Sequence, residues 1–269
     1  MNSRFLILLL LVVGVHANAA SFLDAAIDGV HRTAAFQERD RYRHPRETLQ
    51  FLGLRADMTV VEIWPSRGWY TEILAPALRE KGKLYAAGFC IDAKRPPQWR
   101  KDMARELITH FESEPEMYGR VTVTELSIPE CTEIAPAESA DMVLTFRNVH
   151  NWLKGEYEDG VFAAMYAALK PGGVLGIVEH RAAPGTSLQQ MIESGYVTEA
   201  KVKELAAKAG FDFIAHTEVN ANPKDTKDHP RGVWTLPPSL RLKDQDRDKY
   251  LAIGESDRMT LKFVKPVAE

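Results

Sequence analysis

A histidine and an acid–histidine pair follow two apolar runs of the sequence. His150 lies in RNVHNW, directly after the run DMVLTF, and Glu179-His180 ends the run VLGIVE. An imidazole beside a carboxylate can act as a general base, because the pKa of histidine lies close to neutral. We therefore expect His150, Glu179 and His180 to be catalytic residues that take a proton from an acidic nucleophile. A capping or loop role is the alternative for this group.

The same side chains also suggest a metal site, which Asp228 and His229 would complete. Histidine and carboxylate ligands suit zinc or iron. The sequence, however, contains no H-x-x-x-H and no C-x-x-C spacing. We therefore expect no bound metal.

A second chemical feature is the segment VVEIWPSRGWYTEIL, in which an apolar run ends at Glu62 and Gly68 opens a helical pattern. In an open parallel sheet, ligands bind beyond the carboxyl ends of the strands. Amides at the N-terminus of a helix suit a carboxylate or another anion. We therefore expect the backbone amides of Gly68 and Trp69 to bind such a group.

Strand and helix patterns alternate along the chain from residue 59 onward. Apolar residues at helical spacing separate the strands, as from Trp99 to Phe111. Such alternation is typical of a mostly parallel sheet with helices on both faces. The helix that contains Val161 is expected to stop at Pro171-Gly172-Gly173. Seven strands are predicted, at Thr59–Trp64, Lys83–Phe89, Val121–Leu126, Asp141–Phe146, Val174–Glu179, Phe211–Val219 and Arg258–Val264.

Two segments lie outside this alternation. Residues 20–54 have a helical pattern, broken at HPRE (44–47), and would form an N-terminal cap. Residues 220–257 separate the last two strands, and their prolines and tryptophan favour an ordered lid over a disordered loop. A charged surface loop is the alternative. The lid residues expected to line an acceptor pocket are Asp225, Asp228, His229 and Trp234.

Length and charge limit the classes of function. The chain of 269 residues is long enough for one large domain, which we expect at residues 20–269. Its net charge is −3, and no basic run interleaves with aromatic residues, so nucleic acid and anionic membranes are not expected partners. A small-molecule substrate is expected instead.

The first residues have the pattern of a secretory signal peptide. Arg4 precedes the apolar stretch FLILLLLVVGV, and Ala17-Asn18-Ala19 fits a cleavage site. The apolar stretch is too short to span a hydrocarbon layer of about 30 Å. We therefore expect residues 1–19 to be removed after Ala19, no stable membrane insertion, and a periplasmic or secreted protein. An uncleaved anchor is the alternative.

Taken together, the motifs resemble those of class I S-adenosylmethionine-dependent methyltransferases, over about residues 47–265. The resemblance lies in VVEIWPSRGWYTEIL, in SADMVLTFRNVHNW and in LKPGGVLGIVE. It implies a Rossmann-like α/β fold with a seven-stranded, mostly parallel sheet, a C-terminal antiparallel hairpin and helices on both faces. Segments such as NANPKDTKDHP and GVWTLPP are similar to those of a bacterial family of exported, predicted methyltransferases.

The resemblance also implies S-adenosylmethionine as cofactor and a set of residues that bind it. Trp64 and Ser66 stand where the family has glycines, whereas Gly68 matches. Asp92 is the candidate for the ribose hydroxyls, and Ser127 lies where the family contacts the adenine edge. The implied cofactor-binding residues are Glu62, Trp64, Pro65, Ser66, Gly68, Trp69, Tyr70, Asp92, Ser127, Arg147 and Asn148.

Cys90 and Cys131 are the two cysteines of the chain. In the fold implied by the resemblance, they follow neighbouring strands at one edge of the sheet, so a disulfide is expected. Two buried, reduced cysteines are the alternative. The expected activity is methyl transfer to a small molecule or an envelope component. The rival functions are a non-catalytic exported binding protein with this fold and a metal-assisted enzyme.

Overall fold

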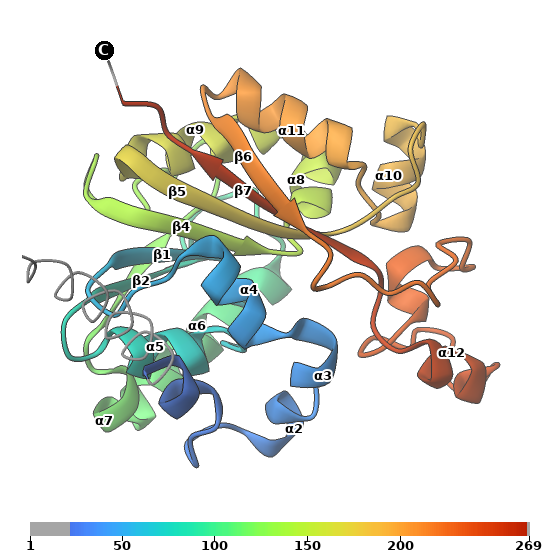
Figure 1. The fold of residues 1–269 in the computed structure, drawn as a ribbon, viewed down its shortest axis with the longest axis horizontal. Coiled ribbons are helices and arrows are strands. Elements are labelled where there is room, and N and C mark those ends of the chain that lie inside the picture. Colours follow the sequence, from blue (N-terminus) through green and yellow to red (C-terminus); the bar gives the residue numbers. More distant parts are fainter. Residues whose placement is uncertain (1–21, 268–269) are drawn as a thin grey trace, which may run out of the picture.

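The computed structural model describes residues 22–267, and these form one seven-stranded sheet covered by helices (Figure 1). The strand order is β3-β2-β1-β4-β5-β7-β6, and β7 runs antiparallel to both β5 and β6. The predicted mixed sheet with a C-terminal antiparallel pair is therefore confirmed. The strands are β1 Thr59–Ile63, β2 Lys83–Gly88, β3 Val121–Glu125, β4 Ala140–Phe146, β5 Leu169–His180, β6 Asp212–Thr217 and β7 Arg258–Val264.

The sheet reverses its strand order between β1 and β4, because β2 and β3 extend it on one side of β1 and β4 begins the other side. Glu62 of β1 is level with Ala86 of β2 and Leu144 of β4. The carboxyl ends of the three strands therefore lie side by side. Both faces of these strands are buried, which explains why they appear as continuous apolar runs in the sequence.

Helices cover both faces of the sheet, and each face has its own hydrophobic core (Figure 1). On one face lie α4 Pro45–Leu52, α5 Thr71–Leu78, α6 Gln98–Ser113 and α7 Pro115–Tyr118. On the other lie α8 Val149–Gly155, α9 Glu158–Ala168, α10 Leu188–Ser194 and α11 Glu199–Lys208. The predicted apolar stripe of α6 is only partly buried: Leu107 and Phe111 are in the core, but Trp99 is 55% exposed.

The boundary between α9 and β5 differs from the prediction, because α9 ends at Ala168 and not at Pro171-Gly172-Gly173. The residues after it already belong to β5: Leu169 pairs with Ala140, and Gly172 and Gly173 exchange backbone hydrogen bonds with Lys265. These long-range partners draw the segment into the sheet, although its local sequence is typical of a turn.

The N-terminal cap consists of several short helices with breaks between them. Residues 22–27 are helical, and α2 Ala34–Gln37, α3 Asp40–Arg43 and α4 follow. The predicted break at HPRE is confirmed: His44 is left-handed (φ 39°), and Pro45 is the first residue of α4. The predicted signal peptide lies outside the described residues. Among residues 22–267, no helix has the length and apolarity that a membrane crossing requires.

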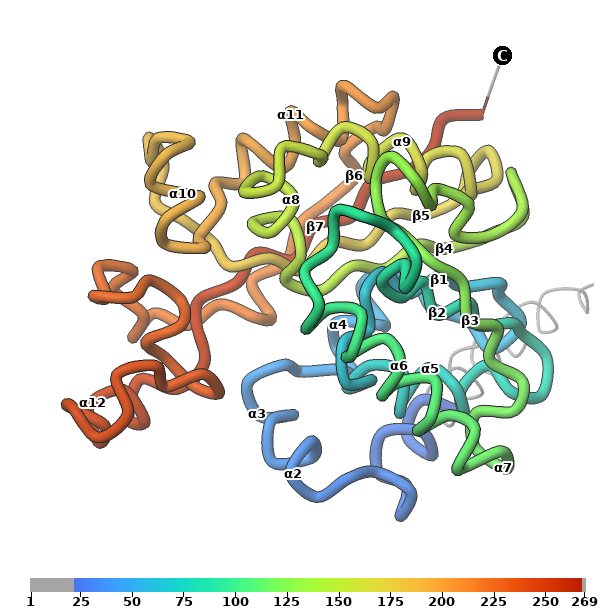
Figure 2. Tube along the Cα trace, turned by 180° about the vertical axis from the view of Figure 1, so that it is seen from behind, coloured from blue at the N-terminus to red at the C-terminus, as the bar shows by residue number. Residues whose placement is uncertain are grey.

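The predicted lid forms a lobe beside α10, at one end of the sheet (Figure 2). It contains the 3-10 helix η1 Gly232–Thr235 and α12 Arg247–Ile253 between β6 and β7. Trp234 packs against the satellite core of Ala182, Tyr196 and Val233. These contacts tie the lid to the segment between β5 and α11.

Candidate active site

Two connected cavities lie at the carboxyl ends of the strands. The inner cavity, of 190 Å³, lies at the carboxyl ends of β1 and β4. The outer cavity, of 1490 Å³, lies between α6, α8, α10 and the lid. Ser66, Trp99, Arg100, Met103 and Asn151 line both cavities. The inner cavity is also lined by most residues predicted to bind a cofactor, namely Glu62, Trp64, Pro65, Ser66, Trp69, Tyr70, Arg147 and Asn148.

The backbone of the β1–α5 loop keeps a glycine-like shape without its glycines. Trp64, Ser66 and Gly68 have φ angles of +46°, +59° and +80°. For a residue other than glycine, this left-handed conformation costs roughly 1–2 kcal/mol. Such strain persists only where the surrounding structure enforces it, and it is concentrated at functional sites.

Glu62 lies at the inner cavity and is buried. The hydroxyl of Thr71, the first residue of α5, donates a hydrogen bond of 2.7 Å to Glu62 Oε2. Burial raises the pKa of Glu62 to about 7, and this hydrogen bond offsets only part of the effect. The acid that was predicted from its strand-end position is therefore held in a dry environment at the switch point of the sheet.

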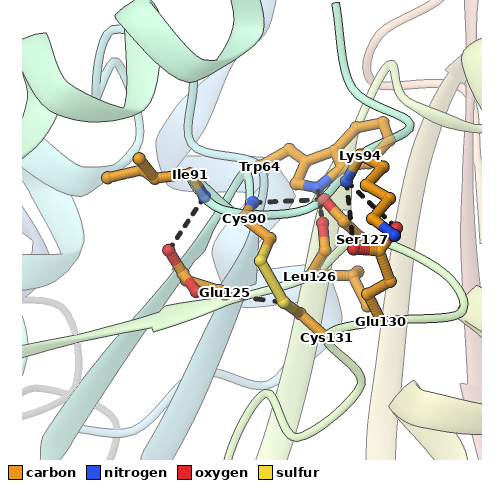
Figure 3. The surroundings of a disulfide bond; sticks show 9 residues. All are labelled: Trp64, Cys90, Ile91, Lys94, Glu125, Leu126, Ser127, Glu130 and Cys131. Atoms are coloured by element: carbon orange, nitrogen blue, oxygen red, sulfur yellow. Dashed lines mark hydrogen bonds between the residues drawn. A yellow bond between two sulfur atoms is a disulfide. The ribbon is translucent and has the colours of Figure 1, made fainter.

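The Trp64 side chain fills space towards β3. Its indole Nε1–H donates to the backbone oxygen of Leu126 (2.9 Å), as Figure 3 shows, and its ring lies 4.6 Å from that of Phe89. Trp64 is only 5% exposed. The space that remains in the inner cavity is below the roughly 300–1000 Å³ of typical small-molecule pockets. A nucleoside-sized ligand therefore needs part of the outer cavity as well.

Arg100 separates the two cavities. Its guanidinium lies about 5 Å from the rings of Trp64, Phe89 and Trp99, at 4.9, 5.2 and 5.1 Å. It donates to Tyr157 Oη (3.0 Å) and to Asn151 Oδ1 (3.4 Å). Arg100 Nε is buried and has no hydrogen-bond partner among the described residues.

Four arginines surround Glu255 beside the inner cavity. Arg39 Nε and Arg43 Nε lie 2.6 and 3.3 Å from its carboxylate oxygens, Arg147 Nη1 lies 3.8 Å away, and Arg258 Nη2 is also paired with it. Burial would raise the pKa of Glu255, but the arginines outweigh this effect and hold it below the usual range. One carboxylate thus faces four guanidinium groups.

This arginine cluster has unused hydrogen-bonding capacity. Arg39 Nη2, Arg43 Nη1 and Arg258 Nε are buried without a partner in the described part of the chain. Burial lowers the pKa of Arg43 well below its usual value and that of Arg147 to about 10. Arg43 and Arg147 both line the inner cavity. An anion there would relieve the excess positive charge and satisfy these donors.

The predicted catalytic pair His150 and Glu179 is assembled at the outer cavity. Glu179 is fully buried at the end of β5 and accepts the backbone N–H groups of His150 (3.3 Å) and His180 (2.8 Å). It also accepts from His150 Nδ1 (3.0 Å). This leaves His150 Nε2 as the acceptor of Asn151 Nδ2–H (3.0 Å), and both residues line the outer cavity.

His180 has a different environment from His150. Its Nδ1 shares a hydrogen bond of 2.5 Å with Ser256 Oγ, and its ring lies 5.3 Å from that of His150. Burial, with a smaller effect from His150, lowers the pKa of His180 well below its usual value. His180 is not among the residues that line the two cavities, so it packs behind His150 and does not face a ligand. His150, Glu179 and His180 lie close enough to hold a metal ion, but the hydrogen bonds just described already satisfy Glu179.

Three of the four predicted lid residues line the outer cavity: Asp228, His229 and Trp234. Asp225 does not. It is buried beneath the lid, where its carboxylate accepts from Tyr196 Oη–H (2.9 Å), His229 Nε2 (2.8 Å) and the amide of Asp257 (2.7 Å). Asp225 therefore positions the lid, and we do not place it in the acceptor pocket.

Three predicted cofactor residues also lie outside the cavity linings. Asp92 is exposed, and Ser127 Oγ accepts the amide of Cys90 (3.1 Å), next to the Cys90–Cys131 disulfide (Figure 3). The predicted disulfide is thus confirmed, and it braces the ends of β2 and β3. The amide of Gly68 donates to Pro65 O (2.9 Å), so it is not available to an anion as expected.

Several important residues were missed by the sequence interpretation. Arg43 lies in the segment RDRYRHPRE, which was interpreted only as part of a helical cap. Glu255 precedes β7, and Arg258 is its first residue. Charged residues are common at the start of a strand, so their types did not indicate a site. Arg100 and Asn151 border residues that were considered, Trp99 and His150, but their types gave no signal of their own.

No model of a protein family and no curated protein matches the sequence. Among solved structures, a SAM dependent methyltransferase from Aquifex aeolicus has 20% identity and a TM-score of 0.51, covering 72% of this chain and 91% of that chain. Phosphoethanolamine N-methyltransferase 2 of Haemonchus contortus, in complex with S-adenosyl-L-methionine, has 16% identity and a TM-score of 0.54, covering 91% and 60%. The cyclase SpnF has 16% identity and a TM-score of 0.51, covering 95% and 96%. At these identities the similarity shows the fold: the chain has the Rossmann-like fold of class I methyltransferases.

Proposed function

We propose that the protein is an S-adenosylmethionine-dependent methyltransferase that acts on a small molecule in the outer cavity. The observation that carries this proposal is the β1–α5 loop, in which Trp64, Ser66 and Gly68 keep the left-handed backbone although two of them are not glycine. The solved structures with this fold include proteins described as dependent on, or in complex with, this cofactor. Fold alone does not establish activity, since the cyclase shares it.

The residues of the inner cavity fit the amino-acid part of the cofactor. Arg43 and Arg147, with buried donors beside them that lack partners, would hold its carboxylate. Glu62 and Asn148 would lie near its amino group, because both line the cavity at the ends of β1 and β4. The nucleoside would extend past Ser66 towards the outer cavity, since Trp64 occupies the space towards β3.

The chemistry required of the side chains is limited. S-adenosylmethionine supplies a methyl group already activated by its sulfonium, so that positioning the acceptor contributes most of the rate. His150 accepts, at Nε2, the proton that an acidic acceptor loses. Glu179 holds the imidazole in the tautomer that leaves Nε2 free for this task. Asn151, which now donates to Nε2, would release it to the acceptor.

The test is calorimetry with two ligands that share a nucleoside. S-adenosylhomocysteine carries the amino-acid part, and 5′-methylthioadenosine lacks it. The wild type should bind the first more tightly. Arg43→Met should weaken S-adenosylhomocysteine about tenfold or more and leave 5′-methylthioadenosine unchanged, because it removes a charged hydrogen bond to the carboxylate. Arg41→Met, on the exposed side of α3, is the matched control. Failure of the wild type to bind S-adenosylhomocysteine at millimolar concentration contradicts the proposal.

The second candidate is a non-catalytic binding protein with this fold. The position of Trp64 favours it, because the indole reduces the inner cavity to 190 Å³. Trp64→Gly separates the two: in a protein that has lost the cofactor, removing the indole should create S-adenosylhomocysteine binding that the wild type lacks. In a working methyltransferase, the wild type binds without this change.

We also propose that residues 1–19 are a signal peptide and that the protein acts in the periplasm or outside the cell, like the exported methyltransferases that the sequence resembles. The Cys90–Cys131 disulfide supports this, because such bonds persist mainly in oxidising compartments. Cell fractionation with mass spectrometry of the N-terminus tests it. A chain that retains Met1 in the cytoplasmic fraction would contradict this localisation.

A further inference from the structure

The outer cavity has an excess of positive charge, although the chain carries a net charge of −3. Its lining contains six lysines or arginines against two acids, Glu193 and Asp228. The basic residues are Arg95, Arg100, Lys154, Lys227, Arg231 and Arg241. In a chain with more acidic than basic residues, this concentration of positive charge in one cavity is not an average property of the surface.

Most of these cations are not neutralised by the protein. Lys227 Nζ is paired with Asp257 (2.9 Å), but within residues 22–267 none of the other five forms an ion pair. Arg241 stacks over Trp234 at 4.7 Å, and Arg100 stacks over Trp64. Stacking of this kind holds a guanidinium in place. Within the described residues, the side-chain N–H groups of Arg241 stay available to a ligand, whereas Arg100 already donates to Tyr157 and Asn151.

The cations also converge from separate segments of the chain. Arg95 precedes α6, Lys154 belongs to α8, and Arg231 and Arg241 come from the lid. They therefore border the cavity from several sides, with His150 among the residues that line it. A cleft lined by one sign of charge concentrates ligands of the opposite sign.

We propose that the acceptor held in the outer cavity is an anion that carries a phosphate or carboxylate group. The role of this anion as a methyl acceptor rests on the proposed methyltransferase function. The lid arginines and Lys154 bind the anionic group, whereas the acceptor atom faces His150. Binding of the anion itself requires no cofactor, so it is tested on the protein alone.

Tryptophan fluorescence provides a direct test, because the two accessible tryptophans both line the outer cavity. Trp99 is 55% exposed and Trp234 is partly exposed, whereas Trp64, Trp69 and Trp152 are at most 5% exposed. A positive potential in the cavity raises the ratio of iodide to caesium quenching above that of free N-acetyltryptophanamide, by about threefold or more. Inorganic pyrophosphate should protect both tryptophans from iodide.

The variant pair that sharpens this test is Lys154→Gln with Arg231→Gln, since neither side chain stacks on a tryptophan in the described structure. Together they should weaken pyrophosphate protection about tenfold, because two charged contacts are lost. The matched control, Arg55→Gln with Lys81→Gln, removes the same charge from exposed positions that line neither cavity. A ratio of iodide to caesium quenching equal to that of free N-acetyltryptophanamide, with no protection by millimolar pyrophosphate, overturns the proposal.

Two further probes identify the source of the anionic group. Glycerol 3-phosphate represents a soluble acceptor, and vesicles of phosphatidylglycerol present a phosphate in a headgroup. Protection by glycerol 3-phosphate supports a soluble acceptor, and protection by vesicles alone supports a headgroup. If pyrophosphate binds and S-adenosylhomocysteine does not, the anion site stands and the methyltransferase proposal fails.

Discussion

His150 Nδ1 lies 3.0 Å from Glu179 Oε1, and the carboxylate is fully buried at the end of β5. Because Glu179 also accepts the amides of His150 and His180, its position is fixed by backbone and not by solvent. The imidazole is thereby held as the Nδ1–H tautomer, with Nε2 as the acceptor at the outer cavity. The pair has the geometry of a base and the residue that positions it.

Replacing Glu179 should change the tautomer of the His150 imidazole, because Glu179 accepts its Nδ1–H. In Glu179→Leu, the Nδ1–H loses its acceptor, so long-range proton–nitrogen NMR of the ring should show a shift towards the Nε2–H form. Turnover should fall about 10²–10⁴-fold, while S-adenosylhomocysteine affinity stays constant. Glu106→Leu, at an exposed site on α6, is the control for the same change of glutamate to leucine. An unchanged tautomer in Glu179→Leu would remove Glu179 from this role.

Glu62 should make the protein less stable as pH rises. Burial raises its pKa in the folded state to about 7, above the usual 4.5, so the folded protein holds a proton that the unfolded chain releases between these values. Stability from this group is therefore present below pH 4.5 and lost as pH rises to 7, by about 3 kcal/mol. Glu62→Gln should be more stable than the wild type at pH 8 and nearly equal to it at pH 4.5.

The difference in free energy of unfolding between the wild type and Glu62→Gln separates the effect of Glu62 from that of His180. Burial lowers the pKa of His180 below 6.5, so His180 lowers stability as pH falls below that value, in the opposite direction to Glu62. Denaturation by urea at several pH values measures the difference, with Glu80→Gln, at an exposed position after the end of α5, as control. A constant gap between wild type and Glu62→Gln across this range would show that Glu62 ionises normally.

Gly68 and Gly172 offer a matched pair for the β1–α5 loop. Both have φ +80°, and a Cβ at either would meet only ordinary contacts, at 3.6 and 3.7 Å. Either glycine changed to alanine should therefore cost roughly 1–2 kcal/mol of stability. Only Gly68→Ala should also weaken S-adenosylhomocysteine, because Gly68 closes the turn with Pro65 that shapes the inner cavity. Equal S-adenosylhomocysteine affinity in the two variants would show that the shape of the β1–α5 loop does not determine binding.

The sheet could be predicted from the sequence because its central strands are buried on both faces and appear as apolar runs. The carboxyl-end residues Glu62, His150 and Glu179 followed from the same reasoning, since strand ends of a parallel sheet share one edge. The arginine cluster around Glu255 could not be predicted. It joins the cap, the residue after β4, the end of the lid and the start of β7. Nothing in the local sequence tells which charged residues meet across such distances.

The errors have physical reasons too. The turn at LKPGG has local signals for an end of structure, but pairing of Gly172 and Gly173 with Lys265 extends β5 through it. Asp92 was chosen as the acid nearest the end of β2, yet the chain after Gly88 follows the disulfide towards β3 and leaves Asp92 in solvent. Long-range partners outweighed local pattern in both cases.

The Cys90–Cys131 disulfide should make a large contribution to stability. It closes a loop with a sequence separation of 41, for which loop-closure entropy gives about 4 kcal/mol. The double variant Cys90→Ala with Cys131→Ala should lose about this amount in urea denaturation, and so should the wild type after reduction.

Agreement between the two samples excludes an effect of the alanines themselves. The same change should reach the inner cavity, because Trp64 Nε1–H donates to Leu126 O, next to the bridged segment at Ser127 (Figure 3). Release of that segment frees the indole, so buried tryptophan fluorescence should become accessible to acrylamide. If reduction lowers stability but leaves quenching unchanged, the disulfide braces β2 and β3 without holding Trp64 in the cavity wall.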